Sequence, residues 1–359
     1  MTHVATIAIQ SSQVTADLDN YRLDVDLSNL GAPFWDSVDN GGGKIRCYKN
    51  DGTTELPREV ASCLTASDTG QLHIRFLGDV LAASNTLVQI HVVDGASEPA
   101  ATATFGRDAV WSDDYYVIVH GNDLTTESRS GKTISQVGTV STTTGPRSGT
   151  GAISIDANNS GLRVDVGTFG DVNRTLQAWG RQTVAGAGGT RVLVGIADPN
   201  VGNDQINIRF SGGNESQFNF AAGGSFTNID GSSVSTGWHM MHLVIDSDGA
   251  AKTMYANGAS VASTIVGWNP AGVDRLGIGI SADSTPFGGD DIEISGVRFR
   301  LGELSAAWIA AEYINQSAPT TFYNVTDIAA SGDIIHSIAG AGGIAGPGGN
   351  AGRFGGIAG

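Results

Sequence analysis

The chain has 359 residues, 51 of them glycine, and carries a formal net charge of −16. This length corresponds to about two domains, because single hydrophobic cores stop growing at about 250–300 residues. An acidic chain without a cluster of Lys or Arg repels phosphate backbones and anionic lipids. We therefore expect no nucleic-acid partner and no membrane insertion, whereas the excess of carboxylates is compatible with bound Ca²⁺.

The cysteines and the first residues bear on the compartment. Cys47 and Cys63 are the only cysteines, so at most one disulfide could form, and we expect buried free thiols. The opening MTHVATIAIQSSQ lacks the charged and apolar regions of a signal peptide, and no stretch has the ~18 apolar residues of a membrane span. A protein of this kind would leave a cell by another route, such as lysis with a virus particle.

Short alternating runs fill the first hundred residues. In NYRLDVDLSNL, Tyr21, Leu23 and Val25 alternate with polar residues, which is the two-residue period of a half-buried strand. Similar runs follow in GGKIRCYKNDG, QLHIRFLG and TLVQIHVVDG, and the NDG at Asn50–Gly52 is typical of a hairpin turn. We predict a β-sandwich domain over residues 1–104.

About eleven further short strands follow from Phe105, separated by turn residues. This number of strands predicts a two-sheet sandwich or jelly roll. Two linked hairpins are expected to turn at Asp248–Gly249 and Asn257–Gly258. We assign this second domain to residues 105–325.

One segment, LSAAWIAAEYIN, has a helical pattern. Ser305 is placed as its N-cap, and Trp308, Ile309 and Tyr313 are spaced so that they share one buried stripe. We expect this helix to cover an open end of the second sandwich.

Glycine recurs at every third position of the last twenty residues, at Gly340, Gly343, Gly346, Gly349, Gly352 and Gly355. A helix with three residues per turn, of the polyglycine II type, places these glycines along one edge, where another backbone can pack closely. A free collagen helix is disfavoured because Pro347 is the only proline of the segment. Apolar residues such as Phe354 are stabilised most when an interface buries them.

We therefore predict that residues 326–359 form an assembly tail, which packs into a homo-oligomer, with a trimer as the expected form, or docks onto another structural protein. A flexible linker is the alternative. The predicted fold class is all-β: two tandem β-sandwich (jelly-roll) domains with one short helix and a C-terminal glycine-rich, polyglycine II-like arm.

Two pairs of segments carry a resemblance to known families. GWHMMHLVIDSDGAAKTMYANGASVAS, followed by DIEISGVRFRLGELSAAWIAAEYIN, resembles the closing half of a laminin G-like, concanavalin A-like jelly roll. Upstream, GGGKIRCYKNDGTTELPREV and AVWSDDYYVIVHGND resemble the small β-domain of unknown function that often precedes such jelly rolls in bacterial and phage surface proteins. The chain departs from that pattern at His120, which is followed by Gly121 instead of a leucine and an acid.

Catalytic motifs are weak. A retaining glycosidase needs two carboxyl groups about 5–5.5 Å apart, which a strand with Glu-x-Asp-x-x-Glu would supply on one face. In GGDDIEIS, Asp291 and Glu293 share a face, but no third carboxylate follows at that spacing. Neither a His-x-x-x-His or Cys-x-x-Cys zinc spacing nor a nucleophile elbow occurs. We predict a protein that is not an enzyme.

Aromatic side chains are the candidates for sugar binding. Trp179 and Trp238 lie in alternating segments and are expected in the core, whereas Trp268, with Asn269, lies beside turn residues in VGWNPAG. We therefore name Trp268 and Asn269 as the candidate carbohydrate-binding residues.

Calcium is the one cofactor that the resemblance implies, because related jelly rolls often hold it at a sheet rim with carboxylate and carbonyl oxygens. The candidate ligands are Asp156, Asn158, Asp290 and Asp291. Asp and Asn are also common turn formers, so a purely structural explanation stays open.

The leading functional hypothesis is a non-enzymatic structural protein of a phage virion, a tail-fibre, head-fibre or decoration component at the virion surface. Its partners would be itself, other virion proteins and host-surface glycans. The alternatives are a polysaccharide-degrading enzyme of concanavalin A-like fold and a bacterial surface adhesin. Two carboxylates that converge in a groove would favour the enzyme, and neighbouring portal, tail or capsid genes would favour the virion protein.

Overall fold

The computed structural model describes residues 3–111, 114–129, 131–169, 172–184, 189–200, 205–212, 214–222, 225–246, 251–265, 273–283 and 287–329. Residues up to 329 form one compact unit. Its strands far outnumber its short helices, so the predicted all-β class is confirmed. The unit contains two β-sheet bodies, each with its own hydrophobic core.

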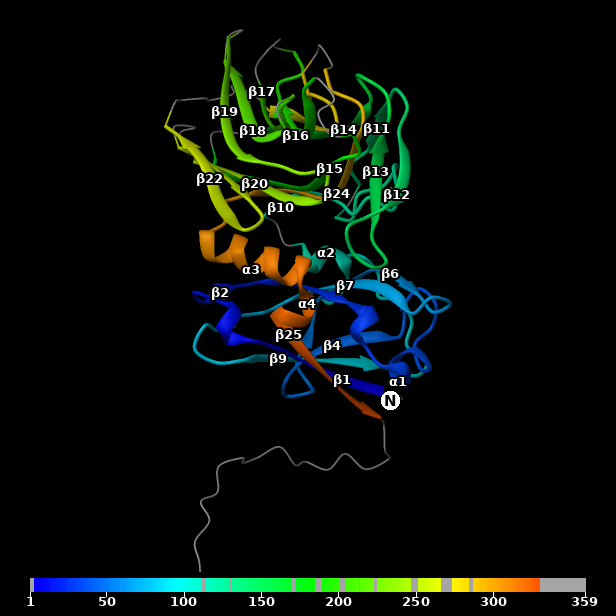
Figure 1. Ribbon diagram of the computed structural model, residues 1–359. Coiled ribbons are helices and arrows are strands. Elements are labelled where there is room, and N and C mark those ends of the chain that lie inside the picture. Colours follow the sequence, from blue (N-terminus) through cyan, green and yellow to red (C-terminus); the bar gives the residue numbers. More distant parts are fainter. Residues whose placement is uncertain are drawn as a thin grey trace, which may run out of the picture. The chain divides into compact units, whose positions relative to one another are not determined.

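The first body has three antiparallel sheets (Figure 1). The five-stranded sheet has the order β25 (Tyr323–Ala329), β1 (His3–Ile9), β9 (Thr86–Val92), β4 (Ile45–Lys49) and β5 (Glu55–Leu56). The three-stranded sheet has the order β3 (Arg22–Asp26), β7 (Thr69–Arg75) and β6 (Arg58–Leu64), and β2 (Leu18–Asp19) pairs with β8 (Asp79–Val80). Two four-residue helices, α1 (Ala32–Trp35) and α2 (Arg107–Val110), flank them.

Residues near both ends of the described chain meet in the first body. All seven residues of β1 pair with β25, from His3 opposite Ala329 to Ile9 opposite Tyr323. The sequence pattern had not indicated a strand at 323–329. The predicted hairpin at Asn50–Gly52 is confirmed: it links β4 to β5, Gly52 has a φ of 66°, and its N–H donates to the Lys49 carbonyl at 2.9 Å.

The second body is a two-sheet jelly roll, as predicted. One sheet has the order β12 (Ser141–Thr144), β13 (Gly151–Ile155), β24 (Ile292–Leu301), β15 (Arg174–Gln182), β20 (His239–Ile245), β21 (Lys252–Ala256) and β22 (Ala259–Thr264), with β10 (Tyr115–Val119) also paired to β24. The other has the order β11 (Ile134–Val137), β14 (Gly161–Phe169), β23 (Val273–Ile278), β16 (Arg191–Ala197), β17 (Gln205–Phe210), β18 (Glu215–Ala222) and β19 (Ser225–Ser233).

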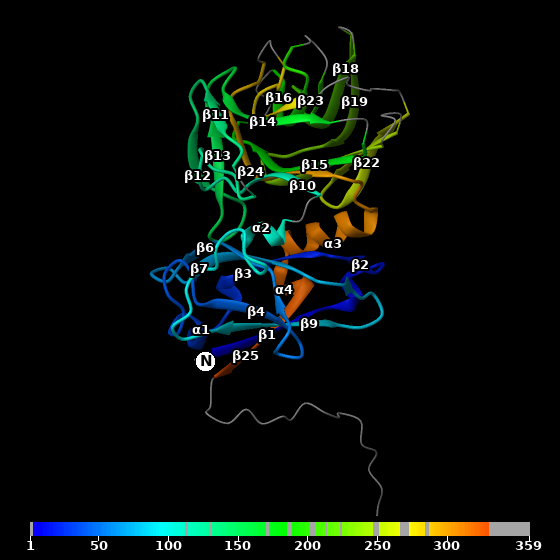
Figure 2. The same ribbon diagram turned by 180° about the vertical axis from the view of Figure 1, so that it is seen from behind.

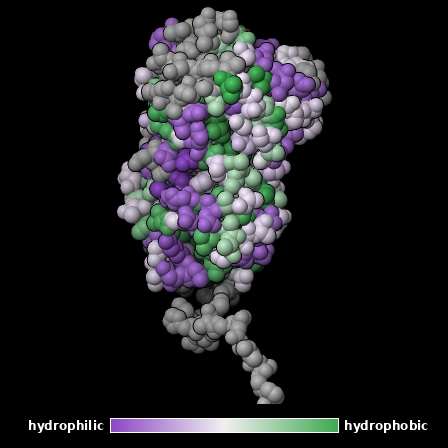
Figure 3. Space-filling model, turned by 90° about the vertical axis from the view of Figure 1, so that its left-hand side faces the viewer, coloured by the Kyte–Doolittle hydropathy of each residue, from purple (hydrophilic) through white to green (hydrophobic). Residues whose placement is uncertain are grey.

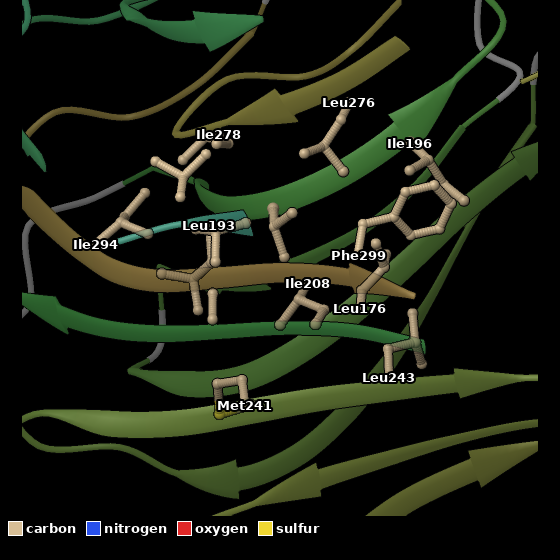
Figure 4. Close-up of a cluster of buried hydrophobic side chains, with 14 of the residues drawn as sticks. Leu176, Leu193, Ile196, Ile208, Met241, Leu243, Leu276, Ile278, Ile294 and Phe299 are labelled. Carbon is tan, nitrogen blue, oxygen red and sulfur yellow. The ribbon is translucent and has the colours of Figure 1, made fainter. Parts of the chain in front are cut away.

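The inner faces of these two sheets enclose a core of aliphatic and aromatic side chains. Figure 4 shows Leu176, Met241 and Phe299 from one sheet facing Leu193 and Ile278 from the other. The predicted turn at Asn257–Gly258 links β21 to β22, with φ values of 51° and 82°. Asp248–Gly249 lies outside the described residues.

The predicted helix is confirmed as α3 (Ala306–Ser317), and the Ser305 hydroxyl caps it by accepting from the Trp308 N–H at 3.2 Å. Figures 1 and 2 show α3 between the two bodies, where it contacts β3 on one side and β22 on the other. Trp308 and Ile309 belong to the core of the first body. A four-residue helix, α4 (Pro319–Phe322), then leads into β25.

Helix α3 buries polar side chains that bind to both bodies. Asn315 pairs with the backbone of Asp24 in β3: its Nδ2 donates to the Asp24 carbonyl at 2.7 Å and its Oδ1 accepts from the Asp24 N–H at 2.8 Å. Gln316 accepts from the Trp179 indole of the jelly roll at 2.7 Å. One helix face thus fixes the two bodies against each other.

A buried ion-pair network lies at the centre of this junction. Arg298 of β24 donates from Nη2 to both Asp24 oxygens at 3.1 Å and from Nη1 to Glu312 of α3, and all three side chains are at most 2% exposed. Burial raises the pKa of Asp24, but Arg298 and His73 outweigh it and hold that pKa well below its usual range. Burial lowers the pKa of Arg298, and the two carboxylates raise it above its usual value.

A β-bulge at Gly296 points Arg298 toward the junction. Gln177 pairs with Arg298 and Trp179 with Ser295, so β24 has one more residue in this interval than β15. The extra residue shifts the alternation, so that Val297 and Phe299 stay in the jelly-roll core while Arg298 lies on the outer face. Gly296 has a φ of 56°, a conformation that favours glycine.

The described surface shows scattered apolar side chains. On the face drawn in Figure 3, hydrophilic residues lie among hydrophobic ones. Isolated exposed apolar residues are normal and do not mark an interface. Cys47 and Cys63 are buried free thiols, as expected. Among the described residues, no helix is long and apolar enough to cross a membrane.

Asp24→Asn should lower the free energy of unfolding by about 3–5 kcal/mol, because it removes one partner of a buried charge. Denaturant unfolding followed by tryptophan fluorescence measures this change. Asp36→Asn, at an exposed position, is the matched control and should change the value by less than about 0.5 kcal/mol. Equal unfolding midpoints for the two variants would show that the network contributes nothing to stability.

Candidate functional site

A pocket of about 290 Å³ lies beside the junction of the two bodies. Its walls come from the end of β3, the loop between β12 and β13, β15, the residue before β20, and the end of α3, with the lining residues Asp26, Pro146, Arg147, Ser148, Trp179, Trp238, Gln316, Ser317 and Pro319. The volume is close to the lower limit of about 300 Å³ for small-molecule sites. Two indoles, a carboxylate, a guanidinium, an amide and hydroxyls therefore share one cavity.

The two tryptophans have different roles in the pocket. Trp179 is 4% exposed, held by Gln316 and stacked on Tyr313 with ring centroids 6.1 Å apart, so it lies in the interior as expected. Trp238, which we also expected in the core, is half-buried and lines the pocket. The Arg181 guanidinium lies 5.1 Å from the Trp238 ring centroid.

Arg181 in turn is fixed by a carboxylate. Its Nε donates to Glu293 Oε2 at 2.6 Å. Glu293, one of the two carboxylates that the sequence offered as a catalytic pair, therefore forms an ion pair with the arginine that lies over Trp238. Glu293 thus fixes the position of Arg181, which in turn contacts the Trp238 ring of the pocket.

The polar lining is preorganised by hydrogen bonds. Arg147 donates from Nη1 to Gln71 Oε1 at 3.2 Å, and the same nitrogen lies 3.9 Å from Asp24 Oδ2. Burial lowers the pKa of Arg147, although Asp24 acts in the opposite direction. Asp26 Oδ1 accepts from the Ser28 N–H at 3.0 Å and its hydroxyl at 2.6 Å. Fixed polar groups beside an indole suit a ligand that has both hydroxyls and an apolar face.

The loop between β12 and β13 is docked on the first body. Ser62 Oγ donates to the Gly149 carbonyl at 2.7 Å, and Gln71 Nε2 donates to the Ser148 carbonyl at 2.7 Å. Gly149 has a φ of 71°, and a Cβ there would lie 2.8 Å from the Gly70 Cα. Close backbone packing therefore fixes the wall that carries Arg147.

A second polar cluster lies deeper in the junction. One ligand atom each from Glu59, His73 and His120 lies within 4.8 Å of the other two, and this is the one such group of three His, Cys, Asp or Glu side chains among the described residues. Glu59 Oε2 lies 3.1 Å from His120 Nε2 and accepts from the Trp111 indole at 2.5 Å. His73 contacts the Asp24 carboxylate through Nδ1.

Burial and charge act in opposite directions in this cluster. Burial raises the pKa of Glu59, but His120, together with His73 and the Trp111 hydrogen bond, outweighs it and lowers that pKa to about 2. Burial lowers the pKa of His73. The sequence search for local zinc spacings could not find this cluster, because its members are 14 and 47 residues apart and come from three separate segments.

The carbohydrate and assembly residues named from the sequence lie outside the described residues: Trp268, Asn269, Gly340, Gly343, Gly346, Gly349, Gly352, Gly355 and Phe354. Their roles stay predictions.

The calcium candidates lie in two turns of the jelly roll. Asp156 and Asn158 are exposed after β13, and Asp290 and Asp291 are half-buried before β24. Among the described residues, these three aspartates do not form a group with oxygens within 4.8 Å of one another. Calcium takes six to eight oxygen ligands, so carbonyls and waters would have to supply most of them. Calcium binding here stays a prediction.

Comparison with known proteins agrees with the jelly roll. Residues 156–310 match the family model described as the concanavalin A-like lectin/glucanases superfamily. The second body is thus a concanavalin A-like, laminin G-like domain. The small β-domain resemblance of the first body stays a prediction. No curated protein matches the chain.

Solved structures with a similar fold include two binding domains of botulinum neurotoxin. The serotype D ligand-binding domain, solved in complex with N-acetylneuraminic acid, has 12% identity and a TM-score of 0.46, covering 59% of this chain and 53% of that one. The serotype G binding domain has 14% identity and a TM-score of 0.45, covering 57% and 52%. The chain thus spans about half the length of these structures.

Gly149→Ala should destabilise the protein more than Gly131→Ala does. Both glycines have a φ near 70°, but a Cβ at Gly131 would meet nothing within 4 Å. The shared cost of positive φ is about 1–2 kcal/mol, and overpacking against Gly70 should add about 1–3 kcal/mol at Gly149. Thermal and denaturant unfolding measure the difference. Equal losses would mean that the loop does not pack on the first body as described.

Proposed function

We propose that this chain is a non-enzymatic structural protein of a phage virion, a tail-fibre, head-fibre or decoration component. In this proposal the jelly roll is displayed at the virion surface and binds host-surface glycans through the junction pocket. The glycine-rich tail mediates assembly with copies of the chain or with another virion protein. The observation that carries the glycan-binding part is the pocket, in which the half-buried Trp238 lies beside fixed polar groups.

The lining of the pocket suits a sugar ring. Sugars present hydroxyls at their edges and C–H groups on their faces, so a receptor needs planar polar groups and an aromatic surface. Trp238 supplies the aromatic surface, and Asp26, Arg147 and Gln316 supply acceptors and donors. The match to the lectin/glucanases superfamily supports the same ligand class.

The pocket supports binding over hydrolysis. Glycosidases use two carboxyl groups, about 5–5.5 Å apart in retaining enzymes and about 6.5–9.5 Å apart in inverting ones. Of the described residues that line the pocket, Asp26 is the one carboxylate. Asp26 also accepts two hydrogen bonds from Ser28, and Glu293 is paired with Arg181. Both carboxylates are thus occupied by hydrogen bonds or an ion pair, and the described lining residues contain no acid–base pair.

The virion role rests on the order of the domains and on the tail. A small β-domain before a concanavalin A-like jelly roll resembles the arrangement in bacterial and phage surface proteins. The threefold glycine period of the last twenty residues provides a backbone edge for close packing. The acidic net charge is also compatible with display outside a cell, because it reduces non-specific binding to anionic surfaces.

Trp238→Ala should weaken binding to a responsive glycan at least about tenfold, because the aromatic contact surface is lost. The assay is a printed array of bacterial polysaccharides and oligosaccharides, followed by titration of the best ligand. Phe226→Ala, at a 45% exposed aromatic outside the pocket lining, is the matched control and should bind like the parent chain.

Two further arms separate the alternatives in that assay. Trp268→Ala tests the site named from the sequence, and EDTA treatment followed by addition of Ca²⁺ alone tests a calcium requirement. Loss of binding in Trp268→Ala with full binding in Trp238→Ala would move the site away from the pocket. The absence of any bound glycan, or release of reducing sugar by the parent chain, would refute the proposal of a non-enzymatic glycan receptor.

Deletion of residues 338–359 should leave two folded bodies but abolish the oligomer, because the glycine edge is removed. Gly346→Val should act like the deletion, since a Cβ separates packed backbones. Size-exclusion chromatography with light scattering measures the mass, and electron microscopy of intact particles locates the C-terminus. An unchanged oligomer in both variants would support the flexible-linker alternative.

A further inference from the structure

We propose that Glu59, His73 and His120 bind a divalent transition-metal ion, Zn²⁺ being the ion we expect, at the junction of the two bodies. This site shares no residue with the lining of the glycan pocket or with the calcium candidates in the jelly-roll turns. Two imidazoles and one carboxylate form a ligand set that zinc commonly takes, with a fourth position left for water.

Strand pairing brings the first two ligands together. Glu59 of β6 and His73 of β7 are directly opposite each other in the three-stranded sheet, so their side chains project from the same face. His120 directly follows β10 of the jelly roll, and its ring lies 4.7 Å from that of His73 with an interplanar angle of 8°. Two elements of the first body and one of the second thus bring the three side chains together, and the His120 ring must turn out of this stack for both imidazoles to bind one ion.

The separations are compatible with coordination. Bonds of about 2.0–2.2 Å to a tetrahedral zinc ion place neighbouring ligand atoms about 3.4 Å apart. Glu59 Oε2 and His120 Nε2 are already 3.1 Å apart, and the chosen atoms of all three residues lie within 4.8 Å. The His120 side chain is 14% exposed, against 1% for His73, so we expect His120 to adjust on binding and water to reach the ion from its side.

The hydrogen bonding of His73 is the second, independent observation. Its Nδ1 contacts the Asp24 carboxylate, whereas its Nε2 is buried and has no hydrogen-bond partner among the described residues. Metal-binding histidines usually donate from one ring nitrogen to a carboxylate, which fixes the ring and directs the other nitrogen at the ion. A cluster held by hydrogen bonds alone would leave Nε2 of His73 unsatisfied.

Glu59 is also held in place by a residue outside the cluster. The Trp111 indole donates to Glu59 Oε2 at 2.5 Å, and the Trp111 and His73 ring centroids lie 5.2 Å apart. Asp24, which orients His73, is the carboxylate that pairs with Arg298. The supporting groups of the metal site are therefore those of the junction itself, and a bound ion would link the two bodies.

A second buried histidine–glutamate pair can be compared with the proposed metal site. His242 and Glu312 form another buried pair at 3.1 Å, but among the described residues no third ligand joins them. Glu312 is bound by Arg298 instead. A histidine–glutamate contact alone therefore does not define a metal site here, and His242 supplies the matched control.

The test uses the full-length chain with any affinity tag removed. Elemental analysis of protein reconstituted with Zn²⁺ should find one ion per chain that gel filtration does not remove, and EDTA treatment should lower the melting temperature. Co²⁺ added to the metal-free chain should give visible d–d absorption bands of a four- or five-coordinate ion. The proposal would be overturned if the chain retained no zinc after reconstitution, gave no d–d bands with Co²⁺, and kept the same melting temperature with EDTA.

Variants assign the ligands. His73→Gln and His120→Gln should each weaken Zn²⁺ binding by at least about 100-fold, whereas His242→Gln should leave the affinity unchanged within about twofold. Zn²⁺ affinity equal to that of the parent chain in His73→Gln or in His120→Gln would overturn the assignment. If a variant fails to fold, the Co²⁺ spectrum of the parent chain still decides whether nitrogen and oxygen ligands surround the ion.

Discussion

The structure depends on one buried cation. Arg298 leaves the jelly-roll sheet, enters a region closed to water, and is neutralised by Asp24 from the first body and Glu312 from α3. Removing an arginine from water is costly, and two carboxylates recover that cost only in the right geometry. The desolvation cost of Arg298 is thus offset only when the two bodies and α3 are arranged so that both carboxylates reach the guanidinium. The stability gained from the network is modest by this reasoning, but the alternative arrangements, which would leave a charge buried and alone, are strongly disfavoured.

Most of the architecture follows from local patterns. Two-residue alternation and Asn-Gly or Asp-Gly turns predicted the strands, and Ser305 with the stripe of Trp308 and Ile309 predicted the helix, because these signals act over a few residues. The strand at 323–329 was missed: its pairing with β1 joins residues more than 300 positions apart, and such pairing leaves no local signal. The sequence also did not indicate the contacts of the helix with the first body. Glu312, Asn315 and Gln316 are each buried against a partner from a distant segment.

The same limit applies to the sites. Trp179 and Trp238 could be named as aromatic candidates, but the cavity that both border is completed by Arg147 and Gln316, which the fold brings beside them. The Gly296 bulge is a further case. A strict alternation through β24 would direct Arg298 into the jelly-roll core, and one extra glycine reverses that phase. A sequence pattern shows that Val297 and Phe299 alternate with two arginines, but only the cross-strand pairing with β15 shows on which face they lie.

Because the pocket is built from both bodies and α3, ligand binding and docking of the bodies are thermodynamically linked. Asp26 belongs to the first body, Trp238 to the jelly roll and Gln316 to the helix between them. A ligand that contacts all three binds only the docked state and stabilises it by mass action. The linkage also works in reverse: each contact that fixes the junction, such as Asn315 on the Asp24 backbone or the loop at Gly149 on β6, prearranges the pocket and lowers the cost of ordering it on binding. In the proposed glycan site, the buried charges at Arg298 would therefore contribute to recognition without touching the ligand, because they keep the walls of the pocket in place.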